Sequence, residues 1–133
     1  MVVHPVDPML WTCARPEPLV AAIINLLQNG FKFTRPKTEV QLSAYSSKDG
    51  GVCIDVADHC GGLPEGFASV MFRPFTQANK DQSGLGLGLS IARQSVESEG
   101  GTLSVRDIPG TGCVFTIWLP SAPDRRSGEV EPV

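Results

Sequence analysis

The stretch PEPLVAAIINLLQNGFK, residues 16–32, is the first strong secondary-structure element that the sequence predicts. Pro16 followed by Glu17 suits a first helical turn, because that turn needs no N–H from proline and favours an acidic side chain. Apolar residues then recur at helical spacing, which predicts an amphipathic helix. We expect the helix to end at Arg35-Pro36, since the residue before a proline is pushed out of the helical region.

The predicted helix has an apolar arc and a polar stripe. At ~100° per residue, one broad arc holds its main apolar side chains: Leu19, Val20, Ile23, Leu26 and Leu27. Asn25, Asn29 and Lys32 share a narrow stripe on the opposite side. A solvated face is one interpretation of this stripe, although such faces normally recruit better helix formers than asparagine. Because amide oxygens suit Mg²⁺ and an ammonium neutralises phosphate, the stripe also fits a Mg²⁺-triphosphate.

Two hairpins and a second helix follow. The expected strands are Glu39–Ser46, Val52–Asp58, Thr102–Arg106 and Val114–Leu119, and the expected second helix runs from Gly88 to Glu99. Turn residues at Asp49-Gly50 and at Pro109 to Gly112 join the strands in pairs. The segment up to Thr12 is a weaker candidate for an edge strand, because prolines interrupt it.

This order of elements predicts the α+β class, as a two-layer α/β sandwich with helices on one face of a mixed, mostly antiparallel sheet. Residues 1–120 are expected to form one domain, and residues 121–133, rich in Pro, charge and small side chains, a linker or disordered tail. A chain of 133 residues has no room for a second full domain.

Composition excludes some classes of function. The net charge of −3 without a Lys/Arg cluster disfavours nucleic acid as a partner. The sequence shows neither an apolar run of roughly 20 residues nor a signal pattern, so we expect a cytoplasmic domain that makes no membrane contact itself.

The cysteines lack metal-site spacing and are expected to be small buried hydrophobic residues: Cys13, Cys53, Cys60 and Cys113. Cys60 is the exception to this expectation, because it lies in a Gly-rich loop.

Asp58 ends a predicted strand that runs into the turn Gly61-Gly62. A carboxylate there is a fixed hydrogen-bond acceptor, and glycines let a flat ligand approach the backbone closely. An adenine amine would match this acceptor, whereas a guanine carbonyl would not. The alternative interpretation is an aspartate that only initiates a turn, which is the commoner role of an isolated Asp-x-x-Gly.

Gly84, Gly86 and Gly88 occupy alternate positions immediately before the second predicted helix. Bare N–H groups at a helix N-terminus form an anion site, so phosphate oxygens are the natural ligands. A flexible loop before a helix is the alternative. The glycines are not a Rossmann fingerprint, because no parallel strand leads into them, and a Walker A loop would need a following Gly-Lys-Ser/Thr.

Taken together, these segments resemble the catalytic domain of sensor histidine kinases, in the superfamily that includes DNA gyrase, mismatch-repair and heat-shock chaperone ATPases. The four characteristic boxes of that family occur in order over roughly residues 17–120: an asparagine box at residues 25–34, glycine boxes at 58–62 and 84–91, and a phenylalanine box at 71–77. The resemblance implies the family's Bergerat-type ATP-binding fold, which agrees with the predicted order of elements.

The resemblance also implies roles for individual residues. Asn29 would hold Mg²⁺, with Asn25 and Lys32 assisting at the phosphates, and Asp58 would bind the adenine amine. The remaining nucleotide contacts would come from Gly62, Phe75, Gly84, Gly86 and Gly88, beneath a mobile lid at residues 76–83. In the superfamily's ATPases a glutamate usually replaces Asn25 as general base, so Asn25 favours phosphoryl transfer over hydrolysis.

Three positions in two of the boxes depart from the family pattern. His59-Cys60 follows Asp58 where the family usually has Asn-Gly, which narrows the expected pocket, and Arg73 stands where a glutamate is common.

Neither His4 nor His59 lies in a sequence like the family's phosphoacceptor motif, and we expect no dimerising helical hairpin before the domain. We therefore expect no autophosphorylation by this chain alone.

The expected function is the binding of ATP and Mg²⁺ and transfer of the γ-phosphoryl group to a histidine. That histidine would lie on a separate dimerisation and phosphoacceptor domain, in the same parent chain or in trans, which would in turn serve a response regulator. Two alternatives stay open: a serine kinase of the anti-sigma-factor type and a non-catalytic nucleotide-sensing module.

Overall fold

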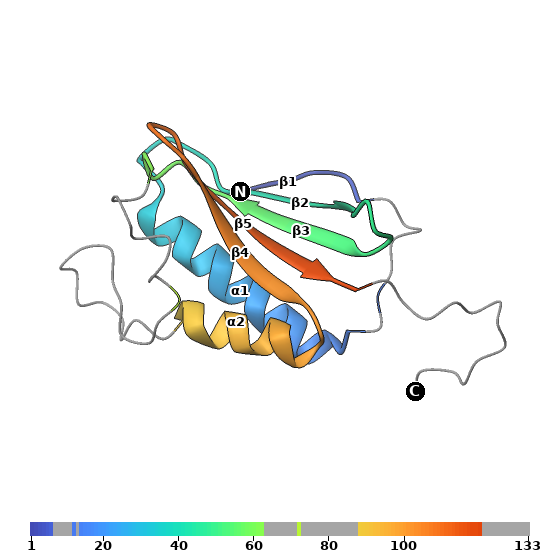
Figure 1. Cartoon of the computed structure of the whole chain (residues 1–133). Helices are drawn as coiled ribbons and strands as arrows, with labels where there is room; N and C mark the ends of the chain where they lie inside the picture. The colour runs from blue at the N-terminus through green and yellow to red at the C-terminus, as the bar shows by residue number, and fades with distance from the viewer. Residues whose placement is uncertain (7–11, 13, 63–71, 73–87, 121–133) are drawn as a thin grey trace, which may run out of the picture.

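The protein is described by a computed structural model covering residues 1–6, 12, 14–62, 72 and 88–120. These residues form a five-stranded sheet with two helices packed on one face (Figure 1). The elements are β1 (Val2–Val3), α1 (Pro16–Phe33), β2 (Gln41–Ser46), β3 (Val52–Ala57), α2 (Gly88–Ser98), β4 (Thr102–Ile108) and β5 (Gly112–Leu119). The predicted two-layer α+β architecture is thus confirmed.

The sheet has the strand order β1-β2-β3-β5-β4. Only β1 is parallel to its neighbour, and the pairs β2–β3, β3–β5 and β4–β5 are antiparallel. The predicted edge strand therefore exists, but it is only two residues long. Because β5 inserts between β3 and β4, the end of β3 lies beside the start of β5, with Ala57 opposite Val114.

Helix α1 keeps the predicted boundaries. Pro16 occupies its first position, Glu17 lies in its first turn, and the helix ends at Phe33, where the Thr34 N–H donates to the Gly30 carbonyl at 2.8 Å. Gly30 has a packing role, because a Cβ placed there would meet both Val40 methyl groups at 3.2 Å. The small residue therefore allows close approach of the helix to the segment that leads into β2.

The buried line of α1 differs from the predicted apolar arc. Ala22, Leu26 and Gly30, spaced four residues apart, are the buried positions of the helix, whereas Val20 is 50% exposed. The assignment of Val20 to the core-facing arc was therefore wrong. The reason is that α2 packs beside α1 on the same face of the sheet (Figure 1). Helix α1 therefore buries the side chains that point between the sheet and α2, and Val20 faces away from both. The expected polar stripe consequently flanks the buried line and is not opposite to it.

The core lies between the helices and the sheet. Its fully buried side chains include Leu26 of α1, Val96 of α2, Val56 of β3, and Phe115 and Ile117 of β5. β5 contributes two of these side chains because it is an interior strand, with β3 and β4 paired to its two sides.

The last hairpin is longer than predicted. Strand β4 continues to Ile108 and β5 begins at Gly112, two residues beyond each predicted end, and Gly110 turns the chain with φ +78°. The tip is supported from outside, because the Gly61 N–H donates to the Thr111 carbonyl at 2.9 Å. Local turn residues could not reveal this support, which ties the hairpin to the loop after β3.

Candidate functional site

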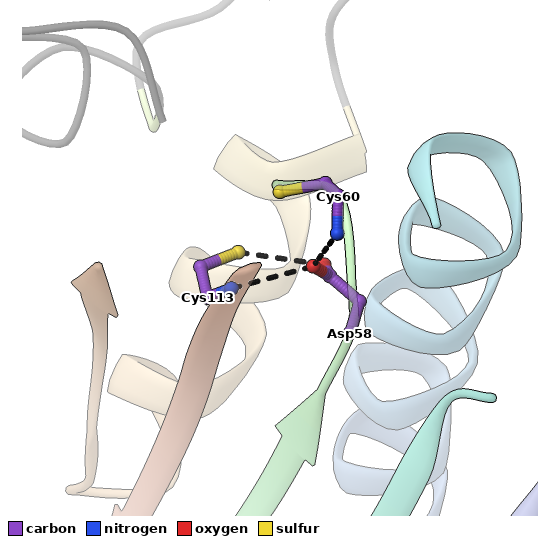
Figure 2. A group of neighbouring side chains, drawn as sticks. All are labelled: Asp58, Cys60 and Cys113. Carbon is purple, nitrogen blue, oxygen red and sulfur yellow. Dashed lines mark hydrogen bonds between the residues drawn. The ribbon is translucent and has the colours of Figure 1, made fainter. Parts of the chain in front are cut away.

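Asp58 follows the last residue of β3 and is buried, with 5% of its surface exposed. Its Oδ1 accepts the backbone N–H groups of Cys60 at 3.1 Å and Cys113 at 3.3 Å, and its Oδ2 accepts the Cys113 thiol at 3.4 Å (Figure 2). A carboxylate offers about four lone-pair positions. Within the part of the chain that the structure describes, these bonds use three of the positions, which leaves one on Oδ2 for a ligand.

The loop after Asp58 depends on its two glycines. Gly61 and Gly62 have φ of +98° and +106°, a region that other residues rarely adopt. A Cβ on Gly61 would also meet the guanidinium group of Arg35. These glycines therefore serve the course of the loop itself, and the close approach of a flat ligand to this backbone stays a prediction.

His59 joins this loop to the C-terminal end of α1. Its backbone N–H donates to the Thr34 Oγ1 at 3.1 Å, and its carbonyl accepts the Arg35 N–H at 3.0 Å. Its ring Nδ1 lies 2.8 Å from the Glu39 carbonyl oxygen. The imidazole is thus engaged with the segment before β2, and the bulk at position 59 is directed there.

Of the three residues of α1 that are predicted to contact Mg²⁺ and the phosphates, two lie close together. Asn25 and Asn29 are half-buried and one helical turn apart, and the Asn25 Oδ1 lies 4.0 Å from where a Cβ of Gly88 would stand. Gly88 is the first residue of α2, so the amide of Asn25 is next to the N-terminus of that helix. Lys32 is exposed, with its Nζ 5.2 Å from the centroid of the Phe33 ring.

Several predicted residues lie outside the described part of the chain: Phe75, Gly84, Gly86, Arg73, the proposed lid at 76–83 and the segment 121–133. Of the phenylalanine box, Phe72 is described. Its ring packs edge-to-face on Phe115 with centroids 6.1 Å apart, and the Arg93 guanidinium lies over it at 5.2 Å. This residue of the box therefore anchors to the hydrophobic core.

Sequence reasoning missed the neighbourhood of Cys60 and Cys113. Their thiols and the Asp58 carboxylate lie within 4.8 Å of one another, although the two cysteines are far apart in sequence. Burial raises the pKa of both thiols, and the negative charge of Asp58 adds to the rise in the pKa of Cys113. Only the register of β3 against β5 brings position 113 to Asp58, so no local pattern could have found the cluster.

Residues 14–123 match the family described as histidine kinase-, DNA gyrase B- and HSP90-like ATPases, and the chain belongs to this family. It is a histidine kinase-type ATPase domain, and the curated relatives that it matches are sensor histidine kinases. It is 35% identical to the circadian input-output histidine kinase CikA of Synechococcus elongatus over 111 residues, which cover 80% of this chain and 15% of CikA. It is also 35% identical to the sensor protein KdpD of Escherichia coli, covering 74% of this chain and 11% of KdpD.

Solved structures agree with this assignment. The mycobacterial sensor histidine kinase MprB superposes with a TM-score of 0.76 at 26% identity, covering 92% of this chain and 82% of that one. The catalytic domain of histidine kinase ThkA gives a TM-score of 0.69 at 26% identity, covering 83% and 70% of the two chains. The chain spans between 11% and 23% of the length of the curated relatives named here and of ZraS from Salmonella typhimurium. Among the residues that the structure describes, no helix is long and apolar enough to cross a membrane.

Proposed function

We propose that this domain binds Mg²⁺-ATP and donates the γ-phosphoryl group to a histidine on a separate dimerisation and phosphoacceptor domain. The observation that carries the proposal is Asp58, a buried carboxylate whose Oδ1 is fixed by two backbone N–H groups while Oδ2 keeps an acceptor position. An exocyclic amine of adenine supplies the donor that this position lacks. Family membership and the sensor-kinase relatives support the same nucleotide.

The donor set on α1 fits the metal and the phosphates. Asn29 would hold Mg²⁺ through its amide oxygen, with Asn25 beside the α2 N-terminus at Gly88. Mg²⁺, when bound, neutralises phosphate charge. Backbone N–H groups at the start of α2 favour an anion, and Lys32 adds a positive charge at the end of α1. Asn25 lacks the basicity to activate water, which favours transfer to a protein over hydrolysis.

The acceptor is proposed to lie outside residues 1–133. The ring Nδ1 of His59 contacts the Glu39 carbonyl, and its backbone is bonded to the end of α1, so this histidine is held as part of the domain structure. We infer that the acceptor domain passes the phosphoryl group to a response regulator and that the domain acts in the cytoplasm, where ATP is available.

Incubation with labelled ATP and Mg²⁺ tests this function. The chain should label separately prepared histidine-bearing helical hairpins and should not label itself. The product should be acid-labile, as phosphohistidine is. An acid-stable product on a serine of the partner would replace the proposal with a serine kinase, and ATP binding without transfer to any hairpin of a broad panel would favour a nucleotide sensor.

Nucleotide binding is the part that the chain can show by itself. Calorimetric titration should show one ATP site per chain whose affinity depends on Mg²⁺. In Asn29→Ala, Mg²⁺ should raise the affinity for ATP less than it does in the wild type. The matched control is Gln28→Ala, one position away on an exposed part of α1. Equal loss in both variants, or none in the Asn29 variant, would contradict the assignment of Asn29 to Mg²⁺.

A further inference from the structure

The side chains of Asp58, Cys60 and Cys113 converge from the end of β3, the loop after it and the start of β5 (Figure 2). One ligand-type atom from each lies within 4.8 Å of the other two. Asp58 and Cys113 are buried, with 5% and 2% of their surfaces exposed, and Cys60 is half-buried. We propose that these three residues bind a thiophilic divalent cation of the Zn²⁺ class, and that the bound cation excludes adenine from Asp58. The second part rests on the proposed function.

The distances fit such an ion. Zn²⁺ lies about 2.3 Å from thiolate sulfur and about 2.0–2.2 Å from carboxylate oxygen. In a tetrahedral site the ligand atoms are therefore separated by roughly 3.3–3.8 Å. The Cys113 Sγ is already 3.4 Å from the Asp58 Oδ2. To complete the site, the Cys60 Sγ must move closer to the other two ligand atoms. The two glycines that follow Cys60 allow its loop to make this movement.

The surroundings of the carboxylate resemble the outer shell of a metal site. Backbone N–H groups of Cys60 and Cys113 hold Oδ1, so Oδ2 is left facing the sulfur atoms. Hydrogen bonds of this kind orient a metal-ligating carboxylate and are part of metal sites generally. With three protein ligands, a fourth position remains for water or a small ligand, as in open zinc sites.

Binding of a divalent cation would exchange two protons for the metal. In the metal-free protein both thiols carry a proton, because the Cys113 thiol donates to Asp58 and the Cys60 thiol donates to the Gly62 carbonyl at 3.6 Å. Binding of M²⁺ by two thiolates and one carboxylate releases two protons, so the net charge of the site stays the same. The affinity must therefore rise with pH.

The two thiols and the carboxylate favour a metal over a simple disulfide. A disulfide would join only the two sulfur atoms, at about 2.05 Å and with restricted dihedral angles, and would not use the Asp58 carboxylate beside them. A cation instead uses all three groups that the structure brings together. It also occupies the acceptor position on Oδ2 that adenine requires, so metal and nucleotide compete for one atom.

Metal binding is tested with the 133-residue chain in a Cys13→Ser/Cys53→Ser background, reduced with a non-thiol reductant and kept free of oxygen. Titration with Co²⁺ should give thiolate-to-cobalt charge-transfer absorption saturating at one ion per chain, and Zn²⁺ should displace it. Cys60→Ser and Cys113→Ser should each weaken Zn²⁺ binding at least tenfold. Cys113→Ser retains a donor to Asp58, so folding should survive, and circular dichroism checks this. Cys53→Ser in the otherwise unchanged chain is the matched control and should bind Zn²⁺ normally.

Competition is measured with adenosine, which lacks phosphates that would chelate Zn²⁺. Its binding, followed by NMR, should be weakened by one equivalent of Zn²⁺ and restored by a chelator, and Cys60→Ser should be insensitive to the metal. Absence of thiolate-to-cobalt absorption overturns the metal site even if adenosine binds through Asp58. A metal site that forms while adenosine binds equally well overturns only the competition. Oxidant-dependent linkage of Cys60 to Cys113 with no metal binding would replace the proposal with a disulfide.

Discussion

Replacing Asp58 with asparagine separates the two roles that this side chain has in the structure. Oδ1 accepts the backbone N–H groups of Cys60 and Cys113, whereas Oδ2 meets the Cys113 thiol and keeps a position for a ligand. Asparagine preserves the first acceptor but places an NH₂ group where Oδ2 was. An adenine amine would then meet a second donor, and the recognition bond would be lost without collapse of the loop.

Replacing Asp58 with asparagine should lower only the affinity for nucleotide, whereas replacing it with alanine should also lower the stability of the fold. We expect Asp58→Asn to weaken Mg²⁺-ATP binding by ~1–3 kcal/mol, the usual cost of disrupting a buried polar pair. This corresponds to roughly a 5- to 150-fold rise in Kd. Asp58→Ala should weaken binding similarly and also lower the free energy of unfolding by ~1–3 kcal/mol, because the N–H groups of Cys60 and buried Cys113 lose their acceptor.

Titration calorimetry at fixed Mg²⁺ and salt measures the binding change, and urea denaturation measures stability. Asp55→Asn is a matched control, because Asp55 lies on the same strand and bonds to Tyr45 and Thr116 and not to the Asp58 loop. Equal affinity of wild type and Asp58→Asn would refute the adenine assignment. Unchanged stability of Asp58→Ala would refute the anchoring role of Oδ1.

Phe115→Ala should lower the free energy of unfolding by ~3–5 kcal/mol in urea denaturation, because the ring is fully buried between neighbouring strands; a loss below 1 kcal/mol would contradict its central place in the core. Gly61→Ala and Gly110→Ala should each cost ~1–2 kcal/mol in the same assay, since both glycines have positive φ and the guanidinium of Arg35 beside Gly61 is the end of a flexible side chain that can move aside; a much larger loss for Gly61→Ala would show that Arg35 is held in place. Tyr45 is the chain's only tyrosine, and its pKa is raised from 10.0 to about 12 by burial and then by its bond to Asp55. Because the folded protein holds this proton to higher pH than the unfolded chain, the stabilisation is full below pH 10.0 and is lost as pH rises toward about 12. Ultraviolet titration of the phenol should show Asp55→Asn lowering the pKa, and an unchanged pKa would exclude that bond as a cause.

The element boundaries were largely predictable because they depend on nearby residues. Helix α1 begins at Pro16 as expected, and the Schellman-type end of α2 follows from Gly100, whose φ is +81° and whose N–H donates to the Glu97 carbonyl. The hairpin turn at Asp49-Gly50 likewise joins β2 and β3 in the expected antiparallel pair. Strand ends were less accurate, since β4 is prolonged by contacts of its tip with the Asp58 loop.

The candidate site was predictable only where one segment carries the chemistry. Asp58 was singled out because it ends a strand that runs into glycines, and the structure shows that its carboxylate is buried and held by backbone N–H groups. Its role as the acceptor for adenine stays a prediction. The roles proposed for Asn25, Asn29 and Lys32 stay predictions, although Asn25 does lie beside Gly88 at the start of α2. The placement of Val20 failed because helical periodicity gives relative directions around the axis, and a second helix decides which direction is buried.

The amino-acid sequence by itself determined the order of helices and strands, the places of the turns and the family to which the domain belongs, because propensities and motifs act over a few neighbouring residues. Only the tertiary structure decided which side of α1 faces the core and that Cys113, 55 residues after Asp58, bonds to its carboxylate. The physical reason is that β5 inserts between β3 and β4. The register of that pairing is fixed by packing over the whole sheet and is encoded in no single segment.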